Sequence, residues 1–238
     1  MKKLTVFCAA ACLAASAAAQ NHPDLHEVLD RQKGRNLIEI PKGTYTLDVR
    51  NNGPYKFHNL TDVHINGNGS TVICNNQEQA FSFYNCVRVE LRDLTIDYDP
   101  LCFTQGEITA VAEDGSWFDV RIDEGYPVTG LAANRVQFYD PQTRLLKRNS
   151  ITTYTSNYSA LKQLGHNLFR AVKNGTWSAG EQVGDLVVMD VKTDKPNAGV
   201  HTVMLNKCYN TKLENVTVYG SNTCLLYTSP SPRDPKTS

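Results

Sequence analysis

The stretch Val89-Glu-Leu-Arg-Asp-Leu-Thr-Ile96 decides the fold, because a matching stretch, Thr211-Lys-Leu-Glu-Asn-Val-Thr-Val218, follows 122 residues later. Both are typical of short strands. Two further pairs share that offset: Phe83 with Leu205, and Cys86 with Cys208. Repetition of this kind is typical of stacked coils, since one coil cannot bury its inner face alone.

The preceding unit repeats the pattern at an offset of 26 residues. This offset places four apolar pairs one above the other: Phe57 with Phe83, Leu60 with Cys86, Val63 with Val89, and Ile65 with Leu91. The turn residues Gly67, Asp93 and Asn215 also align. These registers predict a right-handed parallel β-helix. A meander of hairpins in a β-sandwich is the alternative, but tight two-residue hairpin signals are scarce between these runs.

An interruption of different character separates the matched units. Residues 107–112 and 116–122 flank Glu113-Asp114-Gly115 and predict an antiparallel hairpin. A second hairpin is expected over residues 136–146, around Asp140-Pro141, and the strand Asp185–Val191 closes the segment. We therefore predict an inserted antiparallel β-barrel. Insertions on a solenoid often gather on its binding face.

The expected organisation is all-β, with one helix at residues 23–31. It consists of a signal peptide at 1–19, N-terminal β-helix coils at 20–98, the barrel at 99–199, a resumed coil at 200–223 and a non-native tail at 224–238.

Residues 1–19 have the pattern of a secretory signal peptide. Lys2 and Lys3 precede an apolar run from Leu4 to Ala15, and Ala17-Ala18-Ala19 offers a cleavage site. The run is too short to span a membrane. The Met-Lys-Lys start suggests a bacterium, so we expect a protein that is secreted, periplasmic or on the cell surface.

The last fifteen residues, from Cys224 to Ser238, are interpreted as foreign to the protein. The run Cys224-Leu-Leu-Tyr-Thr-Ser-Pro-Ser-Pro-Arg-Asp234 is what one reading frame of a transposase sequencing adapter encodes. A Pro/Ser-rich disordered tail is the alternative, but an eleven-residue match to one adapter frame rarely arises by chance. We therefore expect a gene product cut at Thr223.

Charge and cysteine spacing limit the possible partners. The chain has 24 basic and 24 acidic side chains, of which residues 20–223 keep 20 and 23, a net charge of −3. We therefore expect no nucleic-acid partner and no strongly charged face for a charged polymer. Neither a metal site nor a cofactor is expected, because no C-x-x-C pair occurs among the mature cysteines, Cys74, Cys86, Cys102 and Cys208.

Cys86 and Cys208 form a predicted stacked pair. If the matched units are neighbouring coils, the two residues lie one above the other at strand spacing, about 4.8 Å. A ladder of free thiols is favoured over a disulfide, since stacked side chains that point the same way have poor disulfide geometry. Two ordinary buried small hydrophobes are the alternative.

Asp97, Asp99 and His201 are the candidate substrate-binding residues. In Leu94-Thr-Ile-Asp-Tyr-Asp99 the two aspartates alternate outward, about 6.5–7 Å apart by strand rise, which is near the separation in inverting glycosidases. Turn capping at a domain junction is the commoner role of such residues. His201 opens the expected returning strand, Val200 to Leu205, where insert and coil meet. A surface histidine whose hydrogen bonds are satisfied is the alternative.

Four stretches resemble secreted β-helix proteins related to the α-1,3-galactosidases of glycoside hydrolase family 110. They are Ile38–Tyr45, Ile96–Gly106, Val183–Val187 and Leu213–Ser221. That family is similar in architecture, with a β-helix interrupted by a small β-barrel after the first coils. The resemblance implies a carbohydrate partner, an oligo- or polysaccharide, and a parent glycoside hydrolase. The family's catalytic acids are expected in later coils, beyond Thr223, so none is assigned here.

Two other classes stay open. A polysaccharide lyase needs calcium-binding carboxylates and a basic residue on one ladder, and the visible coils have no such cluster. A non-catalytic surface β-solenoid that binds glycans is expected to have more uniform coils and no barrel insert.

Overall fold

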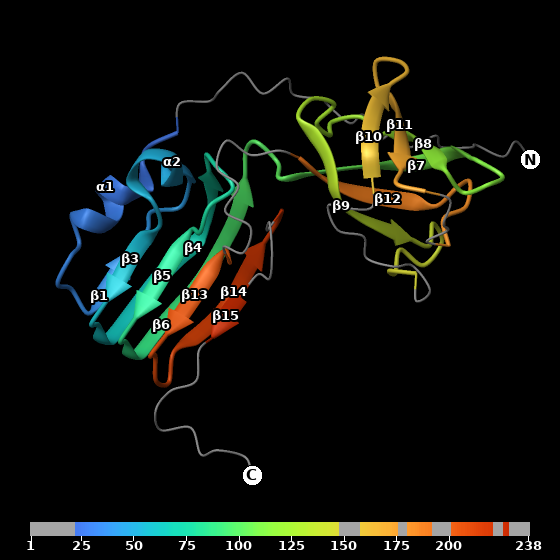
Figure 1. The fold of residues 1–238 in the computed structure, drawn as a ribbon. Coiled ribbons are helices and arrows are strands. Elements are labelled where there is room, and N and C mark those ends of the chain that lie inside the picture. The colour runs from blue at the N-terminus through green and yellow to red at the C-terminus, as the bar shows by residue number, and fades with distance from the viewer. Residues whose placement is uncertain (1–21, 148–157, 176–179, 192–200, 221–225, 229–238) are drawn as a thin grey trace, which may run out of the picture.

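The computed structural model describes residues 22–147, 158–175, 180–191, 201–220 and 226–228 (Figure 1). Strands dominate these ranges and the helices there are short, so the predicted all-β class is confirmed. The expected signal peptide, residues 1–19, lies outside the described ranges. None of the helices in the described part is long and apolar enough to cross a membrane.

The predicted N-terminal helix is present as α1 (Leu25–Asp30). The carboxylate of Asp24 caps it by accepting a hydrogen bond from the backbone N–H of His26, at 2.9 Å. A second helix, α2 (Val49–Asn52), was not predicted from the sequence. It is a single turn capped by Asp48, which accepts from the N–H of Asn51 at 3.1 Å.

One parallel sheet, sheet 1, contains the strand that decides the fold. Its order is β1-β4-β6-β14, and β2 also pairs with β4. The offsets of 26 and 122 hold in the registers, since Leu91 pairs with both Ile65 and Leu213. The strands of sheet 1 are β1 (Leu37–Glu39), β2 (Thr44–Leu47), β4 (Thr61–Cys74), β6 (Val87–Tyr98) and β14 (Lys212–Val218).

A second parallel sheet, sheet 2, keeps the same offsets. Phe83 pairs with Phe57 on one side and with Leu205 on the other. The strands, in sheet order, are β15 (Leu226–Thr228), β13 (Val203–Asn206), β5 (Phe81–Tyr84) and β3 (Tyr55–His58). His201 thus precedes β13 instead of opening it as predicted, because the strand begins at Val203.

The strand β15 falls within the segment that the sequence assigns to a sequencing adapter. It runs parallel to β13, with Leu226 beside Val203. An open sheet edge offers main-chain donors and acceptors to any extended segment. The pairing therefore requires no particular side chains from residues 226–228.

Sheets 1 and 2 share one apolar core. Phe57 and Phe83 stack with their ring centroids 4.8 Å apart, and Ile65, Leu91 and Ile96 are almost completely buried. Leu25 and Leu29 of α1 belong to the same core. Figure 1 shows α1 and α2 at the end of the sheets that is formed by β1 and β3.

The corners between the strands are formed by residues with positive φ. Asn59, Asn85 and Lys207, which follow one another at the two offsets, have φ values of 57°, 55° and 53°. A second column consists of Asp62, Arg88 and Asn210, at 56°, 53° and 52°. Asn and Asp tolerate this left-handed conformation better than most residues, which explains their recurrence at the corners.

Gly67 lies beneath Asp93, as the sequence alignment predicted. A Cβ atom on Gly67 would come within 2.4 Å of the carbonyl oxygen of Asp93, so only glycine fits. The bend in β4 is longer than predicted, since the offset changes from 26 at Asn66–Arg92 to 24 at Ser70–Leu94. Two extra residues are accommodated there as a bulge.

Six antiparallel strands form a separate sheet, sheet 3, with its own core around Phe118 and Phe138. The predicted hairpin over 107–122 is confirmed as β7 and β8. The second predicted hairpin is reduced to a bridge between Tyr139 and Leu146. In sheet order the strands are β10 (Tyr158–Gln163), β11 (Leu168–Lys173), β8 (Trp117–Ile122), β7 (Phe103–Val111), β12 (Leu186–Val191) and β9 (Leu131–Tyr139).

Candidate functional site

The predicted binding residues lie at the junction between the parallel sheets and sheet 3. Asp97 is half-buried and Asp99 exposed, while Tyr98 between them points into the core with 4% of its surface exposed. The Asp97 carboxylate accepts a hydrogen bond from the backbone N–H of Tyr98, at 2.8 Å. Asp99 precedes a cis peptide bond to Pro100. These local contacts are those of residues that turn the chain toward β7.

Tyr98 connects this pair to the chain beside His201. Its hydroxyl donates to the carbonyl of Glu78 at 3.0 Å and accepts from the hydroxyl of Thr202, also at 3.0 Å. Burial raises the pKa of the Tyr98 phenol above its ordinary value. Tyr98 lies between Asp97 and Asp99 in the sequence, and Thr202 directly follows His201. Each of the three predicted residues is therefore next in sequence to one member of the buried Tyr98–Thr202 contact.

Of the predicted stacked pair, Cys86 is buried in the core that sheets 1 and 2 share, and Cys208 is partly buried against that core. Cys86 and Cys208 are both free thiols, and the backbone N–H of Tyr209 donates to the Cys86 carbonyl at 2.8 Å, which fixes the register between the two turns. The Cys86 thiol donates to the carbonyl of Phe57 at 3.1 Å. Burial, above all, raises the pKa of the Cys86 thiol, so it is kept as an unreactive thiol.

A pocket that the sequence did not indicate lies on the outer face of sheet 3. It measures about 250 Å³. Val187 and Met189 of β12 point into the core, so Leu186 and Val188, which alternate with them along the strand, face outward and form an apolar base. The remaining lining residues are Gln105, Gly106, Asp123, Tyr139 and Arg144.

Asp123 is held in place by Gln105. The backbone N–H of Asp123 donates to the carbonyl of Gln105 at 2.9 Å, and the Gln105 side-chain amide donates to the Asp123 carboxylate at 3.1 Å. Gly106 allows this approach, because a Cβ atom there would lie 2.1 Å from the carbonyl oxygen of Arg121 on β8. One carboxylate oxygen of Asp123 therefore has a fixed orientation beside the pocket.

Tyr139 and Arg144 occupy the opposite side of the pocket. The Tyr139 hydroxyl donates to the Gln137 side chain at 2.9 Å. Arg144 follows a tight turn in which the Asp140 carboxylate accepts from the N–H of Thr143 at 2.7 Å, and this hydrogen bond lowers the pKa of Asp140. Arg144 is exposed, and within the described ranges its guanidinium has no carboxylate partner.

These residues were missed because the sequence does not place them together. Gln105 and Gly106 belong to a stretch quoted only for its resemblance, and Tyr139 was assigned to a hairpin. Only the pairing of β7 with β8 and of β12 with β7 and β9 brings the residues into one pocket. The available signal was the outward position of Gln105 and Tyr139 on strands with a buried opposite face.

Other aromatic and histidine side chains that could contact a sugar already contact neighbouring protein side chains. The guanidinium of Arg170 lies 3.5 Å from the ring centroid of Trp117, Tyr126 packs on Phe103 with centroids 5.9 Å apart, and His64 lies 3.0 Å from the Glu90 carboxylate. Trp177, whose indole ring could pack on a sugar, lies outside the described residues. No group of three or more His, Cys, Asp or Glu in the described part of the chain is arranged to hold a metal ion.

Comparison with known proteins adds no assignment. No protein-family model matches the chain, and no curated protein matches it.

Proposed function

We propose that this chain is the carbohydrate-binding N-terminal part of an exported carbohydrate-active β-helix protein, whose parent is a glycoside hydrolase. The observation that carries the proposal is the pocket on sheet 3, which combines an aromatic ring, an oriented carboxylate, a planar amide and a guanidinium. The resemblance to the α-galactosidase family supports the same class. Catalytic carboxylates are assigned to none of the residues described here.

The architecture in this proposal is a right-handed parallel β-helix interrupted by a small antiparallel barrel. The offsets of 26 and 122 residues that recur in both sheet 1 and sheet 2 support successive coils. Right-handedness is the general rule for crossovers between parallel strands of one sheet. The contact between β9 and β10, the two edge strands of sheet 3, supports closure of that sheet into a barrel.

The pocket suits a neutral sugar ring. Sugars present both a flat face of C–H groups and several hydroxyls, so aromatic rings pack on the former and fixed polar groups bind the latter. Tyr139 and the apolar base of Leu186 and Val188 supply the packing surface. Asp123 accepts hydrogen bonds from hydroxyls, Gln105 accepts or donates, and Arg144 donates.

Titration calorimetry of the purified chain with neutral galactosides and other neutral oligosaccharides tests this function. We expect Tyr139→Ala and Asp123→Asn each to weaken binding at least tenfold, about 1.4 kcal/mol. Tyr219→Ala is the matched control, since Tyr219 is 58% exposed on the coil side and lies outside the pocket. Binding that is absent at millimolar sugar, or unaffected by both pocket variants, contradicts the proposal.

A further inference from the structure

A second pocket, of about 250 Å³, opens at the first coil beneath the end of α1. The helix covers part of the core there, and the pocket remains between the end of α1, the loop that follows it and the edge strand β3. Its lining residues are Leu29, Lys33, Gly34, Arg35, Ile38, Tyr55, Lys56, Phe57, His58 and Leu60.

The floor of this pocket is apolar and fixed by the core. Leu29, Ile38, Tyr55 and Phe57 are all at most 6% exposed. The rings of Tyr55 and Phe57 lie 4.9 Å apart, and the Tyr55 hydroxyl donates to Asp30 at 3.0 Å. The floor is therefore held in one conformation by the core before any ligand binds.

The rim of the pocket is cationic. Lys33, Arg35, Lys56 and His58 are exposed, and the pocket lining contains no acidic residue. Lys33 is paired with Asp30 at 2.8 Å. Within the described ranges neither Arg35 nor Lys56 has a carboxylate partner. The overall charge of −3 predicted for residues 20–223 thus conceals a local excess of positive charge.

The loop that carries two of these cations is anchored. The Gln32 side-chain amide donates to the carbonyl of Glu39 at 2.8 Å and accepts from its N–H at 2.9 Å. The N–H of Arg35 donates to the Gln32 carbonyl at 3.2 Å. The rim is therefore partly ordered before a ligand binds, which reduces the conformational entropy lost on binding.

Free backbone groups of β3 complete the pocket. Tyr55 and Asn59 direct their N–H groups toward β5, to the carbonyls of Ala80 and Tyr84, both at 2.9 Å. Since backbone direction alternates along a strand, Lys56 and His58 direct their N–H and C=O groups toward the open edge. These groups are donors and acceptors for hydroxyls beside the cationic rim.

We propose that this pocket binds a single uronic acid unit of an acidic glycan. The carboxylate of the sugar pairs with Arg35 and Lys56, its C–H face lies on the floor formed by Tyr55, Phe57 and Ile38, and its hydroxyls bond to the free edge of β3. The pocket is separate from the one on sheet 3, so neither proposal depends on the other.

Titration of the full chain with methyl galacturonide and methyl glucuronide tests the proposal, with methyl galactoside and benzoate as reference ligands. In the Tyr139→Ala variant, in which the sheet 3 pocket is impaired, we expect a uronide to bind at least tenfold more tightly than the neutral galactoside, and we expect added salt to weaken binding of the uronide. The double variant Arg35→Gln/Lys56→Gln loses at least tenfold of this affinity. Tyr139→Ala leaves it unchanged, which separates this site from the neutral-sugar pocket.

A matched double variant, Lys42→Gln/Arg121→Gln, removes the same charge at two exposed positions outside the pocket. Its melting temperature and that of the pocket variant show whether each protein is folded. Equal loss in both variants means a non-specific charge effect and overturns the proposal. So does tighter binding of benzoate, which lacks hydroxyls, or binding of the neutral galactoside to the Tyr139→Ala variant that equals binding of the uronides. Tighter binding of an acidic peptide than of the uronides also overturns it.

Discussion

The parallel sheets 1 and 2, which we call the coils, and the antiparallel sheet 3, which we call the insert, have separate apolar cores and bring their strands together differently. In the coils the paired residues of neighbouring strands are 23–27 or 122 positions apart in the sequence. In sheet 3 the pairs β7–β8 and β10–β11 are neighbours in sequence. The coils therefore depend on repetition along the chain, whereas much of the insert depends on local hairpins.

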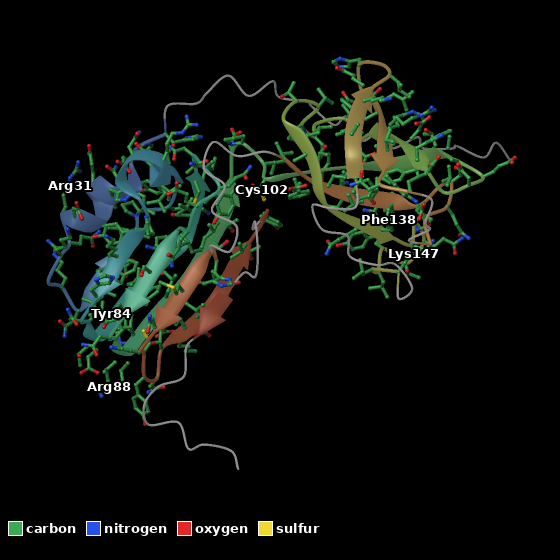
Figure 2. The ribbon with its side chains drawn as sticks, viewed as in Figure 1. Arg31, Tyr84, Arg88, Cys102, Phe138 and Lys147 are labelled. Atoms are coloured by element: carbon green, nitrogen blue, oxygen red, sulfur yellow. The ribbon has the colours of Figure 1, made fainter. Side chains whose placement is uncertain are left out.

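The apolar cores of the coils and of the insert also differ in whether they repeat. The coil core repeats residue types from one turn to the next, as Phe57 stacks on Phe83. The insert packs Phe118 edge-on against Phe138, with centroids 5.5 Å apart, and it also encloses a charged pair, Lys173 and Glu181 (Phe138 is labelled in Figure 2). A repetitive core constrains each position through its neighbours above and below, while the insert depends on a few specific contacts.

The largest effect we expect is on that charged pair. The side chains of Lys173 and Glu181 are 0% and 1% exposed. Glu181→Ala removes the carboxylate opposite a buried ammonium group, and we expect it to destabilise the insert by about 3–5 kcal/mol. Hydrogen exchange of peptides from β11 and β12 measures the loss, while peptides from the coils keep their protection.

Two further variants test whether burial of the Lys173–Glu181 pair is the cause of this loss. Lys173→Met/Glu181→Leu replaces the pair by apolar side chains and is expected to recover most of the stability. Asp62→Ala breaks an ion pair of the coils with Arg88, where both side chains are about half exposed, and a loss below about 1 kcal/mol is expected. Equal losses in the buried and the exposed pair would show that burial does not set the difference.

Repetition also explains how much of the structure the sequence could predict. The registers of the coils followed from aligned residues such as Ile65, Leu91 and Leu213, because an error in one coil conflicts with the next. The bulge after Asn66 was missed because it interrupts the period without changing the apolar pattern that follows.

The insert was predicted less completely for physical reasons. The hairpin of β7 and β8 has a clear turn, but β11 carries a lysine, Lys173, at a buried position and so departs from an apolar alternation. The pockets were not predictable, because their residues meet only through pairing between distant strands. Asp97, Asp99 and His201 lie near the junction between the parallel sheets and sheet 3, and their roles in binding stay a prediction.

Raising the pH into the alkaline range is expected to lower the stability of the coil side, by an amount between those of the largest and the smallest effects predicted here. Cys102 lies between the two groups of strands (Figure 2), and its thiol donates to the carbonyl of Gly220 at 2.7 Å. Burial raises its pKa from the ordinary 9.0 to about 11. Burial likewise raises the pKa of the Cys74 thiol in the coil core.

A raised thiol pKa means that the folded state favours the neutral form. The stability that the neutral Cys102 thiol contributes is fully present below pH 9. It is lost as the pH rises from 9 to about 11, because in that window the thiol of the unfolded chain loses its proton while the thiol of the folded chain keeps it. For Cys102 we expect a slope of up to about 1.4 kcal/mol per pH unit in that window. Urea unfolding across pH 8–11 measures it, and Cys102→Ala should flatten the slope. An unchanged slope in this variant would assign the alkaline loss to other groups.

The smallest effect we expect is a change in stability from a substitution at one of the repeated corner positions. Lys207 occupies the column of Asn59 and Asn85 with a φ of 53°, and the Asn85 amide donates to Asn59 at 2.8 Å. Lys207→Asn places a residue suited to this conformation one turn above Asn85 and extends the amide ladder. It gives up an exposed contact with the Tyr84 hydroxyl, at 3.1 Å. We expect a net gain of about 0.5–1 kcal/mol in the coils.

The matched control for this variant is Lys56→Asn. Lys56 lies within β3, outside the positive-φ residues, and asparagine is disfavoured in strands. We therefore expect no gain from it when exchange protection of the coil peptides is compared in the two variants. Equal shifts would mean that the gain comes from loss of a lysine charge. A gain confined to Lys207→Asn would show that this corner column of the coils contributes stability through its backbone conformation.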